Sequence, residues 1–487
     1  MSIELSRRAF LNSSLLTGAL AGAAIIAPDQ AFAGAAPAGW TLGVADIEAD
    51  LPEAAMTLID GRVPAGFAGI LYRNGPAKFR RAGGKSGHWF DGDGLVRKFD
   101  IRGGGASLAA RFVDTPKRRL ETKLDAIVQP GFGTASGEGS TLSGPDDTNA
   151  ANTSMMMVGG ELMALWEGGS PTLLDPQNLA TKGFKTFRPD LKQMPFLAHP
   201  RVDADGTVWN LGGGGEQAII WKLSPTGKLI KAEPVKLPRR SYFHDFTATA
   251  RHLIIVLQPW LQEELAFPLS TNMVWRPELG TQVLVIEKDD LSKRRIFELP
   301  TFSFFHLGDG WEESDGTIRF DGCFEADPTF GQRAASALLR GEYIRAPSPI
   351  LTQVALYPDG KAKLQSAGIS AEFPANDKRV AGLPRRFTAH VGHYRSTPFA
   401  HAIGLWDWQK GQDDAYDFGD HQLVEEFVFA PSGKGERDGW LIGTTLNLKE
   451  KRTELHMIDA RKVRFGPVAS FAADVPLPLT FHGIFVS

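Results

Sequence analysis

The chain of 487 residues is predicted to be an all-β protein. Its 53 glycines and 31 prolines interrupt short apolar runs, and no long stretch keeps the 3.6-residue period of a helix. Many short strands at near-regular spacing favour a β-propeller, although a double sandwich fits the same pattern. Pairs that favour tight hairpin turns separate the runs, at Asp205-Gly206, Asp315-Gly316, Asp359-Gly360 and Asp438-Gly439, with Thr226-Gly227 in a similar role.

The first 34 residues are predicted to be a bacterial export signal. Residues 6–11 (Ser-Arg-Arg-Ala-Phe-Leu) form a twin-arginine pattern, followed by an apolar stretch at 15–27 and the cleavage pattern Ala-Phe-Ala at 31–33. The apolar run is shorter than the roughly 18 to 20 residues that a membrane span needs. We therefore expect an exported, periplasmic protein. Because twin-arginine export carries folded proteins, a cofactor would be inserted beforehand.

Residues 40–487 are expected to form one domain, because no low-complexity linker divides them. Strands are expected at 207–211, 253–257, 282–286 and 440–444, where β-branched and aliphatic residues alternate or cluster. Helices are expected only in insertions that sit on one face, at 331–345 and at 117–127.

Residues 258–280 form an unusual segment without strand alternation. Two interpretations are open: the segment lines a tunnel mouth for an apolar substrate, or it is a long loop packed on the edge of the barrel. Its apolar side chains also suggest peripheral contact with a membrane. They are Trp260, Leu261, Leu265, Phe267, Leu269, Met273 and Trp275.

Composition and motifs exclude several functions. A net charge of −3 leaves no footprint for nucleic acid, and the single cysteine, Cys323, allows neither an intrachain disulfide nor a thiolate cluster. Metal binding must therefore use histidine and carboxylates. Neither a dinucleotide-binding glycine motif nor a phosphate loop is present, and no Gly-x-Ser-x-Gly lies in a nucleophile-elbow context, so nicotinamide, nucleotide triphosphates and serine hydrolysis are not supported.

Four histidines lie in similar apolar, strand-like contexts: His199, His244, His306 and His482. Imidazole suits iron, copper, nickel and zinc, and four such ligands on an octahedral metal leave positions for oxygen or substrate. A lone buried histidine is more often a core residue with paired nitrogens. Four in matching contexts favour a metal site instead. The remaining seven are expected to be structural or exposed: His88, His252, His390, His393, His401, His421 and His456.

The sequence around these histidines resembles the carotenoid cleavage oxygenases, the retinal pigment epithelial membrane protein family. The resemblance begins with His244-Asp245-Phe246 and includes Ala198-His199-Pro200 and Phe481-His482-Gly483. Near the N-terminus, Tyr-Arg-Asn-Gly-Pro (72–76) and His-Trp-Phe-Asp-Gly-Asp-Gly (88–94) are similar to the family's opening motifs. Together these segments span nearly the whole chain after the signal.

The resemblance implies a seven-bladed β-propeller with loop and short-helix insertions forming a cap over an axial metal site. It implies non-haem iron(II), Fe2+, held by His199, His244, His306 and His482. Glutamates would accept hydrogen bonds from the other ring nitrogens of these histidines, and the matching positions are Glu167, Glu372 and Glu425. Glu425 and Glu426 are adjacent on a strand, so only one is expected to face the metal.

The third ligand segment departs from the family pattern. Where the family commonly has His-x-x-Asn, followed by a small residue, an aromatic and Glu, this chain has Asp309, Gly310, Trp311 and Glu312 after His306-Leu307-Gly308. We expect the aspartate to change local hydrogen bonding without removing the ligand, and Glu312 to be structural.

The expected activity is that of a dioxygenase that cleaves a conjugated C=C bond of a carotenoid or apocarotenoid with O2, giving two carbonyl products. An apolar tunnel would align this substrate beside the metal and exclude water. Aromatic residues near the third ligand either line this channel or belong to the core: Phe302, Phe304, Phe305 and Trp311.

Three alternatives remain. A stilbene-cleaving dioxygenase of the same family would grip a phenol with a lysine and a tyrosine, and Lys117 and Lys123 are the lysine candidates. A propeller could instead bind a ligand or zinc without catalysis. A calcium-dependent lactonase propeller is disfavoured, because it needs axial carboxylates and asparagines rather than four histidines.

Overall fold

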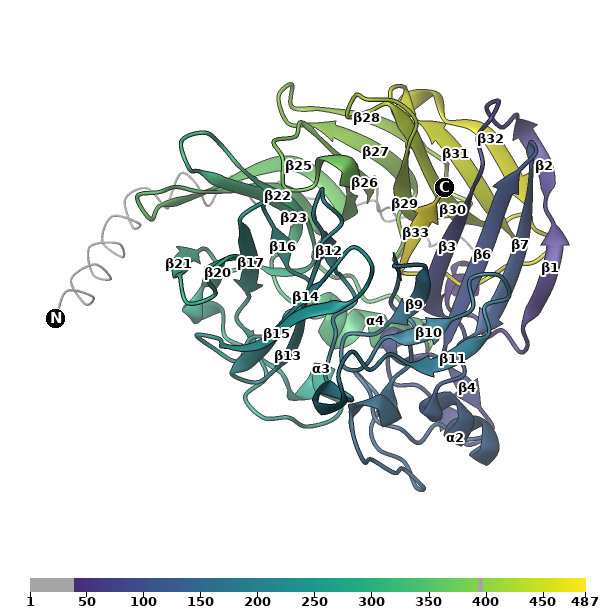
Figure 1. Ribbon diagram of the computed structural model, residues 1–487. Helices are drawn as coiled ribbons and strands as arrows, with labels where there is room; N and C mark the ends of the chain where they lie inside the picture. The colour runs from purple at the N-terminus through teal and green to yellow at the C-terminus, as the bar shows by residue number, and fades with distance from the viewer. Residues whose placement is uncertain (1–38, 393–396) are drawn as a thin grey trace. The chain divides into compact units, whose positions relative to one another are not determined.

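Short antiparallel sheets follow one another along the chain in the computed structural model, which describes residues 39–392 and 397–487 (Figure 1). The predicted export signal, residues 1–34, and His393 lie outside the described residues. Three sheets have four strands each: β8 (Ser154–Val158), β9 (Glu161–Leu165), β10 (Thr172–Leu174) and β11 (Thr181–Phe184); β12 (Arg201–Val202), β13 (Val208–Gly214), β14 (Gln217–Leu223) and β15 (Leu229–Lys236); and β16 (Thr247–Ala248), β17 (His252–Leu257), β20 (Thr281–Glu287) and β21 (Arg294–Leu299).

A seven-stranded sheet contains two further blades. It runs through β22 (Ser303–Glu312), β23 (Ile318–Glu325), β24 (Ile350–Leu356), β25 (Ala362–Ala375), β26 (Phe387–Gly392), β27 (Ala402–Asp407) and β28 (Gln412–Asp417). The 14-residue strand β25 pairs with β24 through its first half and with β26 through its second. It is therefore the outer strand of one blade and the inner strand of the next.

Two five-stranded sheets combine the two ends of the described chain. One contains β1 (Leu51–Ala55), β7 (Gly105–Phe112), β6 (Gly94–Arg102), β3 (Gly69–Pro76) and the C-terminal β33 (His482–Val486); the other contains β2 (Thr57–Gly61), β32 (Pro467–Ala472), β31 (Arg452–Asp459), β30 (Gly439–Asn447) and β29 (Gln422–Pro431). In Figure 1 the yellow β33 lies beside the purple β3, with which it pairs antiparallel. This exchange joins the first blade to the last.

The described residues therefore form seven blades, and the predicted all-β propeller is confirmed over the double sandwich. Inner strands of neighbouring blades contact one another, as β33 does with β8 and β29, and β22 does with β16 and β25. Between blades, the alternating apolar side chains of facing sheets make the core: Trp209 and Ile220 of one blade share a cluster with Ile255 and Leu284 of the next.

Local structure agrees with most of the sequence expectations. Gly206, Gly227, Gly316 and Gly360 adopt the positive φ that tight hairpin turns need, at 83°, 76°, 85° and 87°. Asp438-Gly439 is an exception: it ends the longer loop after β29, and the Asp438 carboxylate accepts a hydrogen bond from Gly435 N–H at 2.8 Å inside that loop.

Helices are short insertions, as expected. They are α2 (Pro116–Leu124), capped by the Thr115 hydroxyl, α3 (Leu269–Asn272), and a π-helical turn (Phe330–Ala334) that continues into α4 (Ala335–Leu338). The helix expected at 331–345 therefore ends at Leu338. Two small ribbons complete the structure, β4 (Arg80–Arg81) with β5 (Gly84–Lys85) and β18 (Trp260–Leu261) with β19 (Val274–Trp275). Within the described ranges, no helix is long and apolar enough to cross a membrane.

Candidate metal centre

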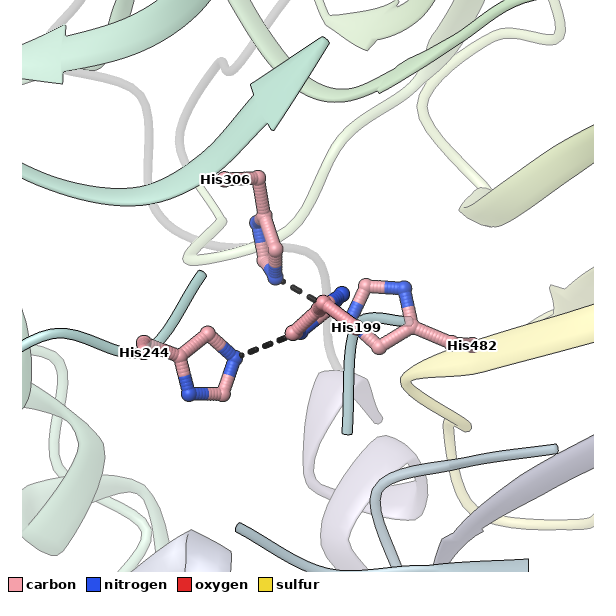
Figure 2. A group of neighbouring side chains, drawn as sticks. All are labelled: His199, His244, His306 and His482. Atoms are coloured by element: carbon pink, nitrogen blue, oxygen red, sulfur yellow. Dashed lines mark hydrogen bonds between the residues drawn. The ribbon is translucent and has the colours of Figure 1, made fainter. Parts of the chain in front are cut away.

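Four histidines from four different blades converge at the inner strands (Figure 2). His199 and His244 lie in the loops just before β12 and β16, His306 lies within β22, and His482 opens β33. One ligand nitrogen from each ring lies within 4.8 Å of all the others. The structure thus brings together the four residues that the sequence predicted.

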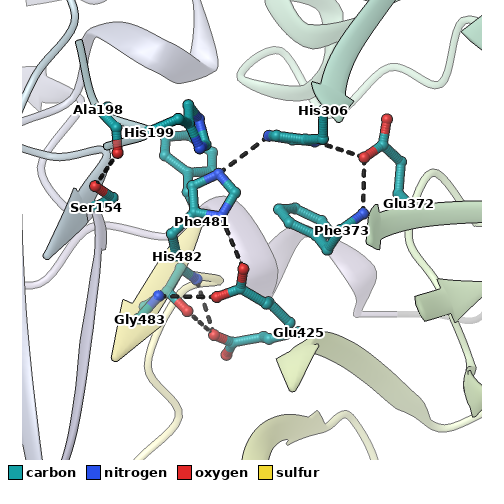
Figure 3. Close-up of polar contacts among 12 residues, drawn as sticks. Ser154, Ala198, His199, His306, Glu372, Phe373, Glu425, Phe481, His482 and Gly483 are labelled. Atoms are coloured by element: carbon teal, nitrogen blue, oxygen red, sulfur yellow. Dashed lines mark hydrogen bonds and ion pairs between the residues drawn. The ribbon is translucent and has the colours of Figure 1, made fainter. Parts of the chain in front are cut away.

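Hydrogen bonds from neighbouring strands hold the loop of His199 in place. Asn210 Nδ2 donates to Leu197 O at 2.7 Å, and the Ser154 hydroxyl donates to Ala198 O, the residue before His199 (Figure 3). These bonds anchor the two backbone carbonyls that precede His199.

Asp245 connects three of the ligand segments, a role that was not predicted from its place in the His244-Asp245-Phe246 motif. Its carboxylate accepts hydrogen bonds from Leu307 N at 2.8 Å and from Arg201 Nη2 at 2.8 and 2.9 Å. Arg201 also forms an ion pair with Asp309 at 3.3 Å. Asp309, the aspartate that departs from the family pattern, is therefore paired with Arg201, which lies two residues after His199. Glu312 instead binds His252 at 2.8 Å, together with Arg251, which supports a structural role.

Three glutamates each accept a hydrogen bond from the Nδ1 atom of one histidine. Glu167 bonds His244 at 2.6 Å, Glu372 bonds His306 at 2.5 Å, and Glu426 bonds His482 at 3.0 Å. These bonds fix the ring orientation and leave the Nε2 lone pairs facing the centre. Tyr242 supports the first of them, because its hydroxyl donates to Glu167 at 3.1 Å.

The choice of Glu425 as the partner of His482 was wrong. Glu425 accepts hydrogen bonds from Thr480 N at 3.1 Å and from Arg73 Nη2 at 3.3 Å, but it does not bond the imidazole. Arg73 also donates to Glu426 at 2.8 Å. A break in register between Val424 and Phe427 interrupts the alternation of β29, so both carboxylates reach the same buried arginine.

Glu372 owes its position to an irregular backbone. Phe373 has φ = 52°, which is uncommon for a residue with a side chain, and the pairing of β25 with β26 shifts register between Glu372 and Ala375. This conformation allows Phe373 N–H to donate to Glu372 at 2.8 Å, while the Phe373 ring stacks on His306 with centroids 4.8 Å apart (Figure 3).

The four nitrogens fit a metal ion better than they fit one another. Nε2 of His199 lies 3.0 Å from that of His244, and Nε2 of His306 lies 3.0 Å from that of His482. At a metal–nitrogen distance of about 2.1 Å, ligands about 90° apart are separated by about 3.0 Å and tetrahedral ligands by about 3.4 Å. These two contacts match neighbouring ligands about 90° apart, as on an octahedral metal with open positions, and all four nitrogens lie within 4.8 Å of one another.

The protonation states of the histidine rings also suit a bound metal ion. Because His306 and His482 both donate from Nδ1, the short contact between their Nε2 atoms requires a cation, either a proton or a metal. Burial lowers the pKa of His482 to about 4, so this ring is neutral at pH 7. Burial lowers the pKa of His306 too, but the charge of Glu372 more than offsets it and the pKa lies above its ordinary value. Burial also lowers the pKa of His199 well below its ordinary value, so His199 and His482 are held in the neutral form in which imidazole binds a metal.

A cavity of about 600 Å³ opens onto this centre and is lined mainly by apolar side chains. His244, His306 and His482 are part of its wall. Of the four aromatic residues proposed for the channel, only Phe305 is among the described lining residues; Phe302 and Phe304 pack in the core, where Phe302 stacks on Phe324, and Trp311 is buried beside Arg385.

Part of the segment 258–280 lines the cavity, as the first of its two interpretations expected, and part of it is packed in the interior. Leu265, Phe267, Leu269 and Met273 line the cavity, whereas the fully buried Trp260 packs in an aromatic cluster with Phe132 and Phe305. The stilbene-type lysine candidates do not reach the cavity: Lys117 is buried against Asp93 and Glu121, at 3.0 and 2.9 Å, and Lys123 is exposed on α2.

The other described histidines have partners within the protein or face solvent. His88 contacts Gly331 O, His252 contacts Glu312 and His390 contacts Asp413. His456 lies between Thr445 and Ser470, and His401 contacts Thr397. His421 is exposed.

Comparisons with known proteins agree with this picture. The family model described as retinal pigment epithelial membrane protein matches residues 44–487. The apocarotenoid-15,15'-oxygenase of Synechocystis is 27% identical over 87% of this chain and 91% of its own length. The isoeugenol monooxygenase of Pseudomonas nitroreducens is 25% identical, over 90% and 95%. The lignostilbene-alpha,beta-dioxygenase isozyme III of Sphingomonas paucimobilis is 24% identical, over 87% and 92%.

Solved structures share the fold. Cobalt-substituted Synechocystis apocarotenoid oxygenase superposes with a TM-score of 0.82 at 24% identity, covering 92% of this chain and 98% of that one. The family model matches nearly all of the described residues, and the solved relative has the same fold. These two findings identify the family. The chain belongs to the retinal pigment epithelial membrane protein family, the carotenoid cleavage oxygenases.

Proposed function

We propose that this protein is a non-haem iron(II) dioxygenase that cleaves a conjugated C=C bond of a carotenoid or apocarotenoid with O2 and releases two carbonyl products. The observation that carries the proposal is the four-histidine centre at the wall of an apolar cavity. Iron bound by His199, His244, His306 and His482 would supply the activation of O2.

The chain's own residues would position the substrate and keep water out. Phe90, Phe132 and Phe305 form a cluster of tilted and edge-on rings, with centroids 5.3 to 5.6 Å apart, in the cavity wall. Such a wall favours a flat, conjugated molecule and excludes water.

The polarity of the wall favours a carotenoid or apocarotenoid over a stilbene. No lysine or arginine is among the described residues that line the cavity, so none of them could pair with a phenolate. Two tyrosines, Tyr242 and Tyr343, line it, and the Tyr242 hydroxyl already donates to Glu167. The similar identities to an apocarotenoid oxygenase and to a lignostilbene dioxygenase keep stilbene cleavage as the second candidate.

Oxygen labelling tests the proposed reaction. The iron-loaded protein, incubated with an apocarotenal under 18O2, is expected to give two carbonyl products, each with one labelled oxygen, analysed before exchange with water. 4-Hydroxystilbene serves as the matched substrate of the second class. Cleavage of the stilbene alone would move the assignment to the second candidate, and no cleavage of either would overturn the proposal.

We also propose that the mouth of the cavity contacts membranes. Leu265 is 77% exposed, and it lines the cavity together with the partly exposed Phe267 and Leu142. Replacing Leu265 and Phe267 together by serine is expected to reduce flotation with phospholipid vesicles several-fold. Phe465→Ser is the control, because Phe465 is 75% exposed but is absent from the cavity wall. Equal flotation of the wild type, the double variant and Phe465→Ser would contradict membrane contact at the mouth of the cavity.

A further inference from the structure

Glu325 is a carboxyl group in the cavity wall to which no described residue hydrogen-bonds. It is the last residue of β23, only 5% of its surface is exposed, and it is among the residues that line the cavity. Its Oε2 atom is enclosed and accepts no hydrogen bond, and no described residue bonds its other oxygen. Glu167, Glu372 and Glu426, by contrast, are each bonded to a histidine.

The surroundings favour the neutral form of this carboxyl. Burial raises the pKa of Glu325 well above its ordinary value, and the nearby charges of Glu372 and Asp327 raise it further. No described cation forms an ion pair with it. A buried polar group without a hydrogen bond costs free energy, so a group retained in such a position needs a partner that the folded chain itself does not supply.

A neutral carboxyl offers one O–H donor and one carbonyl acceptor. A hydroxyl group matches both, since it can accept from the first and donate to the second, whereas an aldehyde or ketone uses only the donor. The aromatic rings of Phe305 and Phe330 line the same cavity and suit a conjugated chain.

We propose that Glu325 binds the hydroxyl group of the substrate and selects a conjugated alkene that carries an alcohol. The inference rests on the proposed function insofar as the substrate occupies this cavity. It assigns Glu325 a role in specificity, separate from the histidines and from the carboxylates that bond them.

Anaerobic binding tests this without turnover. Dissociation constants of the iron-loaded protein are measured for an apocarotenol and the corresponding hydrocarbon in the same detergent, in the wild type, Glu325→Leu and Glu325→Gln. The wild type is expected to prefer the alcohol about 10-fold or more, Glu325→Gln to keep most of that preference, and Glu325→Leu to lose it. Comparing the ratio between variants cancels the different partitioning of the two ligands into detergent.

A second readout uses the wild type and the isosteric variant, and does not depend on the folding of Glu325→Leu. The infrared band of a protonated carboxyl is expected to shift when the alcohol binds, to stay unchanged with the hydrocarbon, and to be missing in Glu325→Gln. An unchanged alcohol preference in Glu325→Leu, or no such band in the wild type, would overturn the inference. Failure of the proposed function appears separately, as absence of cleavage by a protein that still binds the alcohol.

Discussion

Replacement of His482 or of His306 by alanine is expected to abolish both iron retention and cleavage activity. Each ring supplies one of the four converging nitrogens. Because loss of an outer partner alone typically costs roughly 10- to 100-fold in metal affinity, loss of a direct ligand should exceed about 100-fold. Iron per protein after gel filtration in the presence of a weak chelator measures the effect.

The matched control is His456→Ala. His456 is also largely enclosed, at 4% exposure, but it bonds Thr445 and Ser470 within a different part of the propeller. This variant should lose stability and keep its iron. Full iron occupancy in His482→Ala and His306→Ala, with the control also loaded, would contradict the assignment of the ligands.

The adjacent carboxylates of β29 provide the second large effect. Glu426→Gln is expected to weaken iron binding roughly 10- to 100-fold, because the negative charge that orients and polarises His482 is lost. The electrostatic reason is visible in the pKa of Glu426: burial opposes ionisation, but His482, Arg73 and Gly483 N–H together lower this pKa to about 2. Chelator competition measures the iron affinity of each variant.

Glu425→Gln is the matched control for that experiment, one residue away and bonded to the same arginine. Both variants should reduce the free energy of unfolding by about 1–3 kcal/mol, because each weakens a buried, charged hydrogen-bond network. Only Glu426→Gln should change iron affinity. If Glu425→Gln weakened iron binding as much, the assignment of Glu426 as the partner of His482 would fail.

The architecture and the four histidines were predictable because both leave local marks in the sequence. Hairpin turns that need positive φ carry glycine at positions such as Gly206 and Gly316, which separates one strand from the next. The ligand histidines lie beside inner strands, where apolar neighbours are required by burial. His244-Asp245-Phe246 is a further mark, since Asp245 holds the segment of His306.

The partner of His482 could not be predicted, because it depends on an irregularity of β29. Regular alternation would place Glu425 and Glu426 on opposite faces. The register shift between Val424 and Phe427 changes that relation. Neither residue is a glycine or proline, the residue types that would have indicated an irregular strand. The partnership of Arg201 with Asp245 and Asp309 likewise joins three consecutive blades, and only the packing of these blades against one another brings the residues together.

The channel residues were hard to predict for a different reason. Phe302, Phe304 and Phe305 look alike in sequence, but they differ in which packing layer they reach: Phe304 belongs to the core between blades and Phe305 to the cavity wall. Glu325 gave no signal at all, because a glutamate at the end of a strand is usually exposed. Its importance follows only from burial without a partner.

The identity of the bound metal tests the central claim most directly. Protein purified anaerobically without a histidine tag, and analysed for all transition metals and calcium, is expected to contain close to one iron per chain. Zinc, calcium or no metal in a folded, monodisperse protein would contradict the assignment of a four-histidine iron centre and, with it, the proposed dioxygenase.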